Sequence, residues 1–282
     1  MRSAHDVKPA SPHQNVTLRP AFVESGSPEL IRVEGPFLKV EGEWLSHKLE
    51  FFHCFHEGTW CALAGVDVEA SPQTSELTLT GFNGTLVGPT PQDISLPVIV
   101  HPAHYRSGSL TVAPKFVEPD AEAMKEITAE SELKRMVFAH SADSRLWTGS
   151  FLAPVKAPPT DSFGTRRMFN GKLASVHKGM DFRAPSGTPV LAGNAGTVVL
   201  AQPLYYEGNC VILDHGLGLM SYSMHLSRID VKVGDAVAKG QRLGLSGATG
   251  RVTGPHLHWA IRWKGAMLDP AKLLQLKLDD LR

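Results

Sequence analysis

The sequence is poor in cysteine, with 3 among 282 residues. So few cysteines exclude the disulfide-dense scaffolds of small secreted proteins. Cys54 and Cys61 flank the stretch FHEGTW, in which a turn at Glu57–Gly58 would set the two cysteines opposite each other on a hairpin. A cross-strand disulfide depends on that register, so the sequence leaves it open. Cys210 lies in the strand-like NCVILD and is predicted to be buried and inert.

Net charge and long apolar runs are also lacking. The 28 Lys and Arg balance 28 Asp and Glu, which argues against a partner that is a nucleic acid. No apolar run approaches the roughly 20 residues that span a bilayer, so no transmembrane segment is expected. The first residues, MRSAHDVKPASPHQ, lack the apolar core of a signal peptide. The chain is then either cytosolic or numbered from a point after a removed export signal.

Glycine and proline, at 26 and 20 residues, favour a turn-rich and mainly β fold, and the length suggests about two domains. Short β-rich runs such as LIRV and ELTLTGF predict an antiparallel β-sandwich-like accessory domain. PDAEAMKEITAESELKRMVFAH predicts a helix, and the prolines of FLAPVKAPPTDS mark a connection between domains. The expected order is a flexible arm (1–20), the accessory domain (21–117), the helix and Pro-rich linker (118–160), a second β-rich domain (161–270) and a C-terminal tail (271–282).

Two histidine spacings in the second half carry chemistry. HLHWAIRW has the composition of a strand, and side chains two apart on a strand point the same way, so His256 and His258 share one face. His177 and Asp181 form an HxxxD, which Gly179 and the following APSGTP favour as strand or loop rather than helix. Imidazole nitrogen and carboxylate oxygen suit a divalent metal, above all zinc. Spacing alone leaves open the alternative that His177 and Asp181 only cap a loop and make a salt bridge.

The order of motifs in this half decides between these interpretations. The stretches FGTRR, HKGMDFRAPSGTPVLAGNAGTVV, GNCVILDHGLGLMSYSMHLS and VKVGDAVAKGQRLGLSGATGRVTGPHLHWAI occupy about Phe163 to Gly265. With HxGxDF, HLS and GxTGxxTGPHLHW in this order, the segment resembles the lysostaphin-type (LytM) zinc metallopeptidase domain. The resemblance implies an antiparallel β catalytic domain and one Zn²⁺ per chain.

The resemblance also implies roles for individual residues. A zinc-bound water would attack the peptide with the help of two histidines, with His256 preferred as the base and His225 as the partner of the oxyanion, and the reverse left open. His215, in LDHGLG, is expected to be structural. In FGTRR, both arginines could face an anionic substrate or pair with local acids, and Arg166 and Asn170 are the predicted substrate-binding residues. The implied metal ligands are His177, Asp181 and His258.

Members of this family cleave peptides of the bacterial cell wall, so the resemblance implies a peptidoglycan endopeptidase of the periplasm or cell envelope. An accessory β-domain before the catalytic domain is similar to two-domain members that act on D,D cross-links, which are preferred here over glycine bridges. The partners are then peptidoglycan stem peptides and, through the N-terminal domain, an envelope protein. The alternative is a non-catalytic regulator of another cell-wall hydrolase, against which the retained ligands His177, Asp181 and His258 speak.

Overall fold

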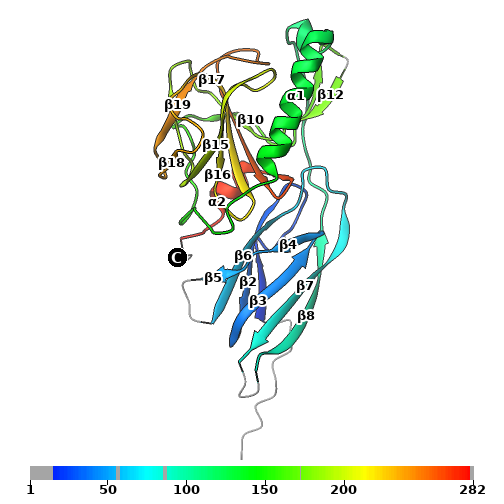
Figure 1. Cartoon of the computed structure of the whole chain (residues 1–282). Coiled ribbons are helices and arrows are strands. Elements are labelled where there is room, and N and C mark those ends of the chain that lie inside the picture. The colour runs from blue at the N-terminus through cyan, green and yellow to red at the C-terminus, as the bar shows by residue number, and fades with distance from the viewer. Residues whose placement is uncertain (1–14, 55–57, 85–87, 172, 280–282) are drawn as a thin grey trace, which may run out of the picture.

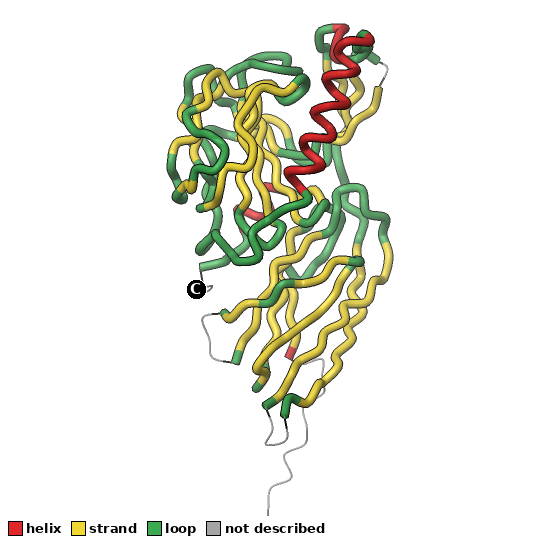
Figure 2. The backbone as a smooth tube through the Cα atoms, in the orientation of Figure 1, coloured by secondary structure: helices red, strands yellow, loops and turns green. Residues whose placement is uncertain are grey.

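The computed structural model describes residues 15–54, 58–84, 88–171 and 173–279. Two β-rich bodies lie end to end, with the N-terminal one at the bottom of Figure 1 and the C-terminal one at the top. The fold is mainly β, as predicted, and Figure 2 shows one long helix beside the upper body. No helix in the described part of the chain has the length and apolar character needed to cross a membrane.

The N-terminal body is a sandwich of two four-stranded antiparallel sheets. Side chains alternate along its strands: on β7 (Gln73–Asn83), Leu77 and Leu79 are buried, whereas Glu76 and Thr78 are exposed. One sheet has the order β1 (Val16–Arg19), β2 (Pro28–Glu34), β6 (Thr59–Gly65) and β5 (Phe52–His53). The other has the order β4 (His47–Leu49), β3 (Phe37–Trp44), β7 (Gln73–Asn83) and β8 (Thr90–Val100).

Strand β1 lies inside the stretch that was expected to be a flexible arm. Val16 is buried, and all four residues of β1 pair in register with β2, because VTLR alternates between a core face and an outer face. The first part of that expectation, residues 1–14, lies outside the described residues. A disulfide joins Cys54 to Cys61 beside β5, which answers the question that the sequence left open, and Cys210 is fully buried, as predicted. Glu57, in the proposed turn, is outside the described residues.

The predicted helix is present as α1 (Ala121–Phe138). Asp120 caps its first turn by accepting a hydrogen bond from the backbone N–H of Ala123. The helix lies along the C-terminal body, where the Glu130 carboxylate accepts the backbone N–H of Tyr205. The side chains of Leu133, Val137 and Phe138 pack on the outer face of the sheet there. A 3₁₀ turn (Pro114–Phe116) precedes the helix.

The C-terminal body is built on a ten-stranded sheet. Its central strands are buried along most of their length, which explains their nearly continuous apolar runs. The main path is β10 (Pro159–Asp161), β13 (Met180–Phe182), β20 (Leu257–Trp263), β17 (Leu219–Ile229), β16 (Gly208–Asp214), β15 (Gly196–Leu204) and β18 (Ala236–Val237). Off this path, β19 (Arg242–Ser246) pairs with β14 (Pro189–Leu191) and β17, and β21 (Ala266–Leu268) pairs with β20.

A separate three-stranded sheet contains one strand from the segment that follows the sandwich. Strand β9 (Ser107–Leu110) runs parallel to β11 (Arg166–Phe169), which pairs with β12 (Leu173–Val176). The sequence expectation placed residues 107–110 in the accessory domain, but their hydrogen bonds belong to the C-terminal body. This pairing joins segments about sixty residues apart in the chain, and the sequence of neither segment predicts it.

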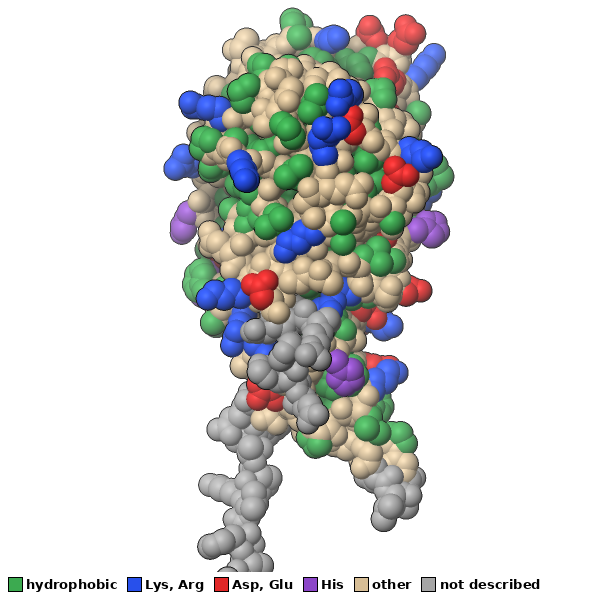
Figure 3. Space-filling view, turned by 90° about the vertical axis from the view of Figure 1, so that its left-hand side faces the viewer, with side chains coloured by type: hydrophobic (Ala, Val, Ile, Leu, Met, Phe, Trp, Pro, Cys, Tyr) green, Lys and Arg blue, Asp and Glu red, His purple; other side chains and the backbone are tan. Residues whose placement is uncertain are grey.

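The two bodies share one hydrophobic core. Gly65 at the end of β6 has no room for a side chain, because Leu268 of β21 fills that space. The backbone N–H of Met267 donates to the Asp67 carboxylate at 2.7 Å, across the same junction. The short helix α2 (Pro270–Gln275) follows, and its Lys272 forms an ion pair with Glu24. On the face shown in Figure 3, lysine and arginine side chains are spread over the upper body.

Candidate metal centre and active site

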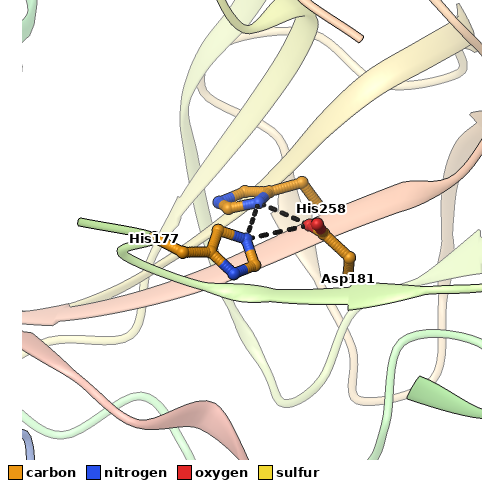
Figure 4. Close-up of side chains that lie close together, drawn as sticks. All are labelled: His177, Asp181 and His258. Atoms are coloured by element: carbon orange, nitrogen blue, oxygen red, sulfur yellow. Dashed lines mark hydrogen bonds and ion pairs between the residues drawn. The ribbon is translucent and has the colours of Figure 1, made fainter. Parts of the chain in front are cut away.

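Strand pairing brings two of the three candidate ligands together. In the antiparallel pair of β13 and β20, Asp181 stands directly opposite His258. Directly opposed residues project on the same face of a sheet, so the carboxylate and the imidazole converge, with 2.8 Å between Asp181 Oδ1 and His258 Nδ1. His177, in the loop before β13, completes the cluster: its Nε2 lies 3.0 Å from each of those two atoms (Figure 4).

This donor set fits a divalent cation. Two imidazole nitrogens and one carboxylate oxygen point at a common centre from a mostly buried position. Tetrahedral ligands about 2.0–2.2 Å from one ion would lie about 3.3 Å apart, so the observed separations need only a few tenths of an ångström of widening. His177 Nδ1 lies 2.9 Å from the carbonyl oxygen of Ser162. An Nδ1–H donated there leaves the Nε2 lone pair free for a metal.

Arg167 supports the carboxylate from the other side. Its Nη2 donates to Asp181 Oδ2 at 2.6 Å, and its Nε donates to Asp161 Oδ2 at 3.0 Å. Burial would raise the pKa of Asp181, but the close contacts of its carboxylate with His177 and His258 outweigh burial and hold that pKa well below its usual range. Asp181 is therefore ionised at neutral pH, as a metal ligand must be.

Gly179 makes room for the ligand cluster. A Cβ at this position would lie 2.5 Å from His258 Nε2 and 2.7 Å from the backbone oxygen of Trp259. Neither the ligand ring nor the central strand can move away easily, so the glycine of the HKGMD stretch serves close packing rather than a turn.

Two further histidines face the cluster without belonging to it. His225 Nδ1 lies 2.9 Å from the carbonyl oxygen of Thr249, and His256 Nδ1 lies 2.8 Å from that of Gly254. Each ring thus donates its Nδ1–H to the backbone and presents Nε2 as an acceptor. The ring centroids of His225 and His256 are 4.9 Å apart, and His256 Nε2 lies 3.8 Å from Asp181 Oδ1.

The backbone of His225 is unusual. Its φ is +62°, a left-handed conformation near an irregularity in the pairing of β16 and β17. Its backbone N–H donates to the carbonyl oxygen of Glu207 at 2.8 Å, which holds this conformation. Burial, followed by the nearby His258 and His256, lowers the pKa of His225 to about 3. The imidazole is neutral over the physiological range.

Residues 175–270 match the profile of peptidase family M23. This part of the chain is an M23 metallopeptidase domain. The chain is 44% identical over 114 residues to the peptidoglycan DD-endopeptidase ShyA of Vibrio cholerae, covering 40% of this chain and 26% of that protein. It is 38% identical over 96 residues to ShyB of the same organism, covering 34% and 22%. The chain thus spans about a quarter of the length of these curated relatives.

A solved structure covers both bodies. A crystal structure of a peptidase M23 from Pseudomonas aeruginosa superposes with a TM-score of 0.66 at 28% sequence identity. The match covers 89% of this chain and 94% of that one, so the similarity extends over both bodies.

The five histidine and aspartate residues lie in a groove of about 620 Å³. Among the described residues, its lining comes from the M23 domain, from β10 and β11, and from Leu110 and Val112 in the segment that carries β9. None of the described lining residues belongs to the two sheets of the sandwich. The N-terminal body does reach the groove at one point, where Glu69 forms an ion pair with Lys178 of the lining.

The two predicted substrate-binding residues lie elsewhere. Arg166 is exposed on β11 and is not among the described lining residues, whereas Arg167, the next residue, points into the site. The Asn170 side chain is bonded twice to the backbone of Val112, at 3.0 Å each way, and so ties β11 to the segment after β9. His215 is fully buried, with Nδ1 2.7 Å from the Ala195 carbonyl, in the structural position expected.

Proposed function

We propose that the chain is a zinc-dependent endopeptidase that hydrolyses the D,D peptide cross-links of bacterial peptidoglycan in the cell envelope. One observation carries the proposal: in an open groove, two histidines present free Nε2 atoms beside a His–Asp–His donor set. The relatives ShyA and ShyB are both named peptidoglycan DD-endopeptidases, which supports the substrate class.

His177, Asp181 and His258 would hold the zinc ion. Three protein ligands of this kind are typical of catalytic zinc sites, which keep one coordination position open. When bound, zinc supplies Lewis acidity and lowers the pKa of water toward about 7. The hydrogen bond from Arg167 to Oδ2 orients the carboxylate of Asp181, and the Ser162 carbonyl fixes the tautomer of His177.

His256 is assigned as the general base. Its Nε2 lies next to the donor set, 3.8 Å from Asp181 Oδ1, and its ring is oriented by the Gly254 carbonyl. It accepts the proton of the attacking water and, as an imidazolium, can return that proton to the leaving amine. His225 is assigned as the partner of the oxyanion. Its Nδ1–H is held by Thr249 and its pKa is about 3 without substrate, so it can donate from Nε2 only when the negative charge of the oxyanion favours its protonated form.

The test is digestion of purified peptidoglycan by the intact chain, with products identified by mass spectrometry. The proposal expects D,D-cross-linked dimers to be converted into monomers, and a chelator to stop the conversion. Protein with stoichiometric zinc that releases no monomers from any wall type would favour a regulator of another hydrolase. Release of peptides cut only within glycine bridges would contradict the D,D assignment.

A further inference from the structure

One loop of the M23 domain orients both free histidines. Its Thr249 carbonyl holds the ring of His225, and its Gly254 carbonyl holds the ring of His256. Arg251 lies between these two positions in the sequence, and its side chain lines the same groove. The mechanism above makes no use of this arginine, although it projects from the segment that shapes the catalytic end of the groove.

The Arg251 guanidinium is held between two aromatic rings. Its central carbon lies 4.6 Å from the ring centroid of Phe169 and 4.6 Å from that of Tyr206. Its backbone N–H donates to the carbonyl oxygen of Tyr206 at 2.9 Å, which fixes the base of the side chain. Rings on the faces of a guanidinium leave its N–H edges free to donate in the plane. Burial lowers the pKa of Arg251 because it destabilises the charged guanidinium, and an anionic partner would offset that destabilisation.

Within the described residues, the charge of Arg251 is offset only through space, by Glu207 and Tyr206. In the part of the chain that the structure describes, no carboxylate forms an ion pair with Arg251. The nearby Glu207 is bonded to Lys134, at 2.5 Å between Nζ and Oε1. Asp161 and Asp181 are occupied by Arg167. A preoriented fork of N–H donors in a substrate groove suits a carboxylate, which can accept two parallel hydrogen bonds.

We propose that Arg251 is a specificity-determining residue that binds a free carboxylate of the substrate peptide. This inference rests on the proposed function and narrows its substrate class. A glycine bridge carries no side-chain carboxylate, whereas a stem peptide carries one on its D-glutamate residue and, in diaminopimelate-type walls, another beside the cross-link. Both candidate residues of the stem peptide would bind Arg251 through a carboxylate. Phe169 and Tyr206 would add apolar contacts with the adjoining peptide.

The experiment compares three cross-linked stem-peptide dimers as substrates of the intact, zinc-loaded chain. One is unmodified, one is amidated at D-glutamate, and one is amidated at diaminopimelate. Charge-assisted hydrogen bonds of this kind correspond to a preference on the order of ten- to a hundredfold in kcat/KM. The wild type should therefore prefer the unmodified dimer over one amidated dimer, and the identity of that dimer shows which carboxylate is bound.

Arg251→Gln should reduce that ratio to near one, and Arg251→Lys should recover only part of it. Arg242→Gln is the matched control, because it removes the same charge from an exposed position paired with Asp230; it should keep the wild-type preference. A wild type that cleaves all three dimers equally, or an Arg251→Gln variant that keeps the preference, overturns the inference while leaving the proposed function intact. A wild type that cleaves none of them overturns the proposed function and this inference with it.

Discussion

Arg167 and Asp181 form a partly buried ion pair in which Nη2 lies 2.6 Å from Oδ2, while the other carboxylate oxygen faces the two histidines of the donor set. The two oxygens of one carboxylate thus have separate partners. Arg167 also forms an ion pair with Asp161, whose Oδ2 lies 3.6 Å from Nδ1 of His177. The arginine therefore fixes the geometry of the ligand set without belonging to it.

Replacing this arginine should weaken metal binding. In Arg167→Gln, two neighbouring carboxylates lose their shared cation, and we expect metal affinity to fall about 10- to 100-fold. Competition with a chromogenic chelator measures it. Arg166→Gln is the matched control, since Arg166 is the adjacent residue and points away from the site. Equal affinities for the two variants would contradict the positioning role of Arg167.

Gly179→Ala should disturb the same site by a steric route. The added methyl group meets His258 Nε2 and a backbone oxygen at distances that real Cβ atoms do not show, so the ligand ring must shift. We expect loss of bound metal and a lower melting temperature, read by elemental analysis and calorimetry. Gly108→Ala, where the structure offers open space, should change neither. Full metal content in Gly179→Ala would show that the ring has a second acceptable position.

Glu29 predicts a pH dependence of stability at the junction of the two bodies. Burial raises the pKa of this carboxyl to about 8, against lowering by the hydrogen bond from Ser27 and the charge of Lys272. The folded chain therefore binds a proton that the unfolded chain releases near pH 4.5. The raised pKa of Glu29 therefore contributes fully to the free energy of unfolding below about pH 4.5, and this contribution is lost as the pH rises toward 8.

Glu29→Gln places a neutral side chain of the same shape at this position, so the variant should not lose stability as the pH rises from 4.5 to 8. In urea unfolding, the variant should gain stability relative to the wild type between pH 5 and pH 8, by a few kcal/mol at most. The His and Asp groups of the active site are common to both proteins and cancel in the difference. A difference that does not change with pH would mean that Glu29 is ionised in the folded state.

The sequence predicted the parts of the site that depend on local pattern. Alternation along HLHWAIRW placed His256 and His258 on one face, and the order of motifs indicated the LytM-type domain that the family match confirms. The sequence did not show that Arg167, rather than Arg166, faces the site. Which of two adjacent side chains faces inward depends on the register of β11 against β9 and β12.

Long-range pairing accounts for the other omissions. Strands β9 and β11, which pair in parallel, lie far apart in the chain. The same is true of Arg251 and the rings of Phe169 and Tyr206 that it contacts. No pattern in the sequence near these residues predicts either contact. Asn170 was predicted to bind substrate, yet its side-chain amide forms hydrogen bonds with the backbone of Val112. Side-chain partners of this kind follow from packing, which the residue type alone does not specify.

The most direct test measures metal content and turnover together in the wild type, His258→Ala and His256→Ala. We predict one zinc per wild-type chain, loss of that zinc in His258→Ala, and retention in His256→Ala with turnover reduced about 10²- to 10⁴-fold. Zinc retained by His258→Ala, or released by His256→Ala, would contradict the assignment of His177, Asp181 and His258 as the metal-binding set.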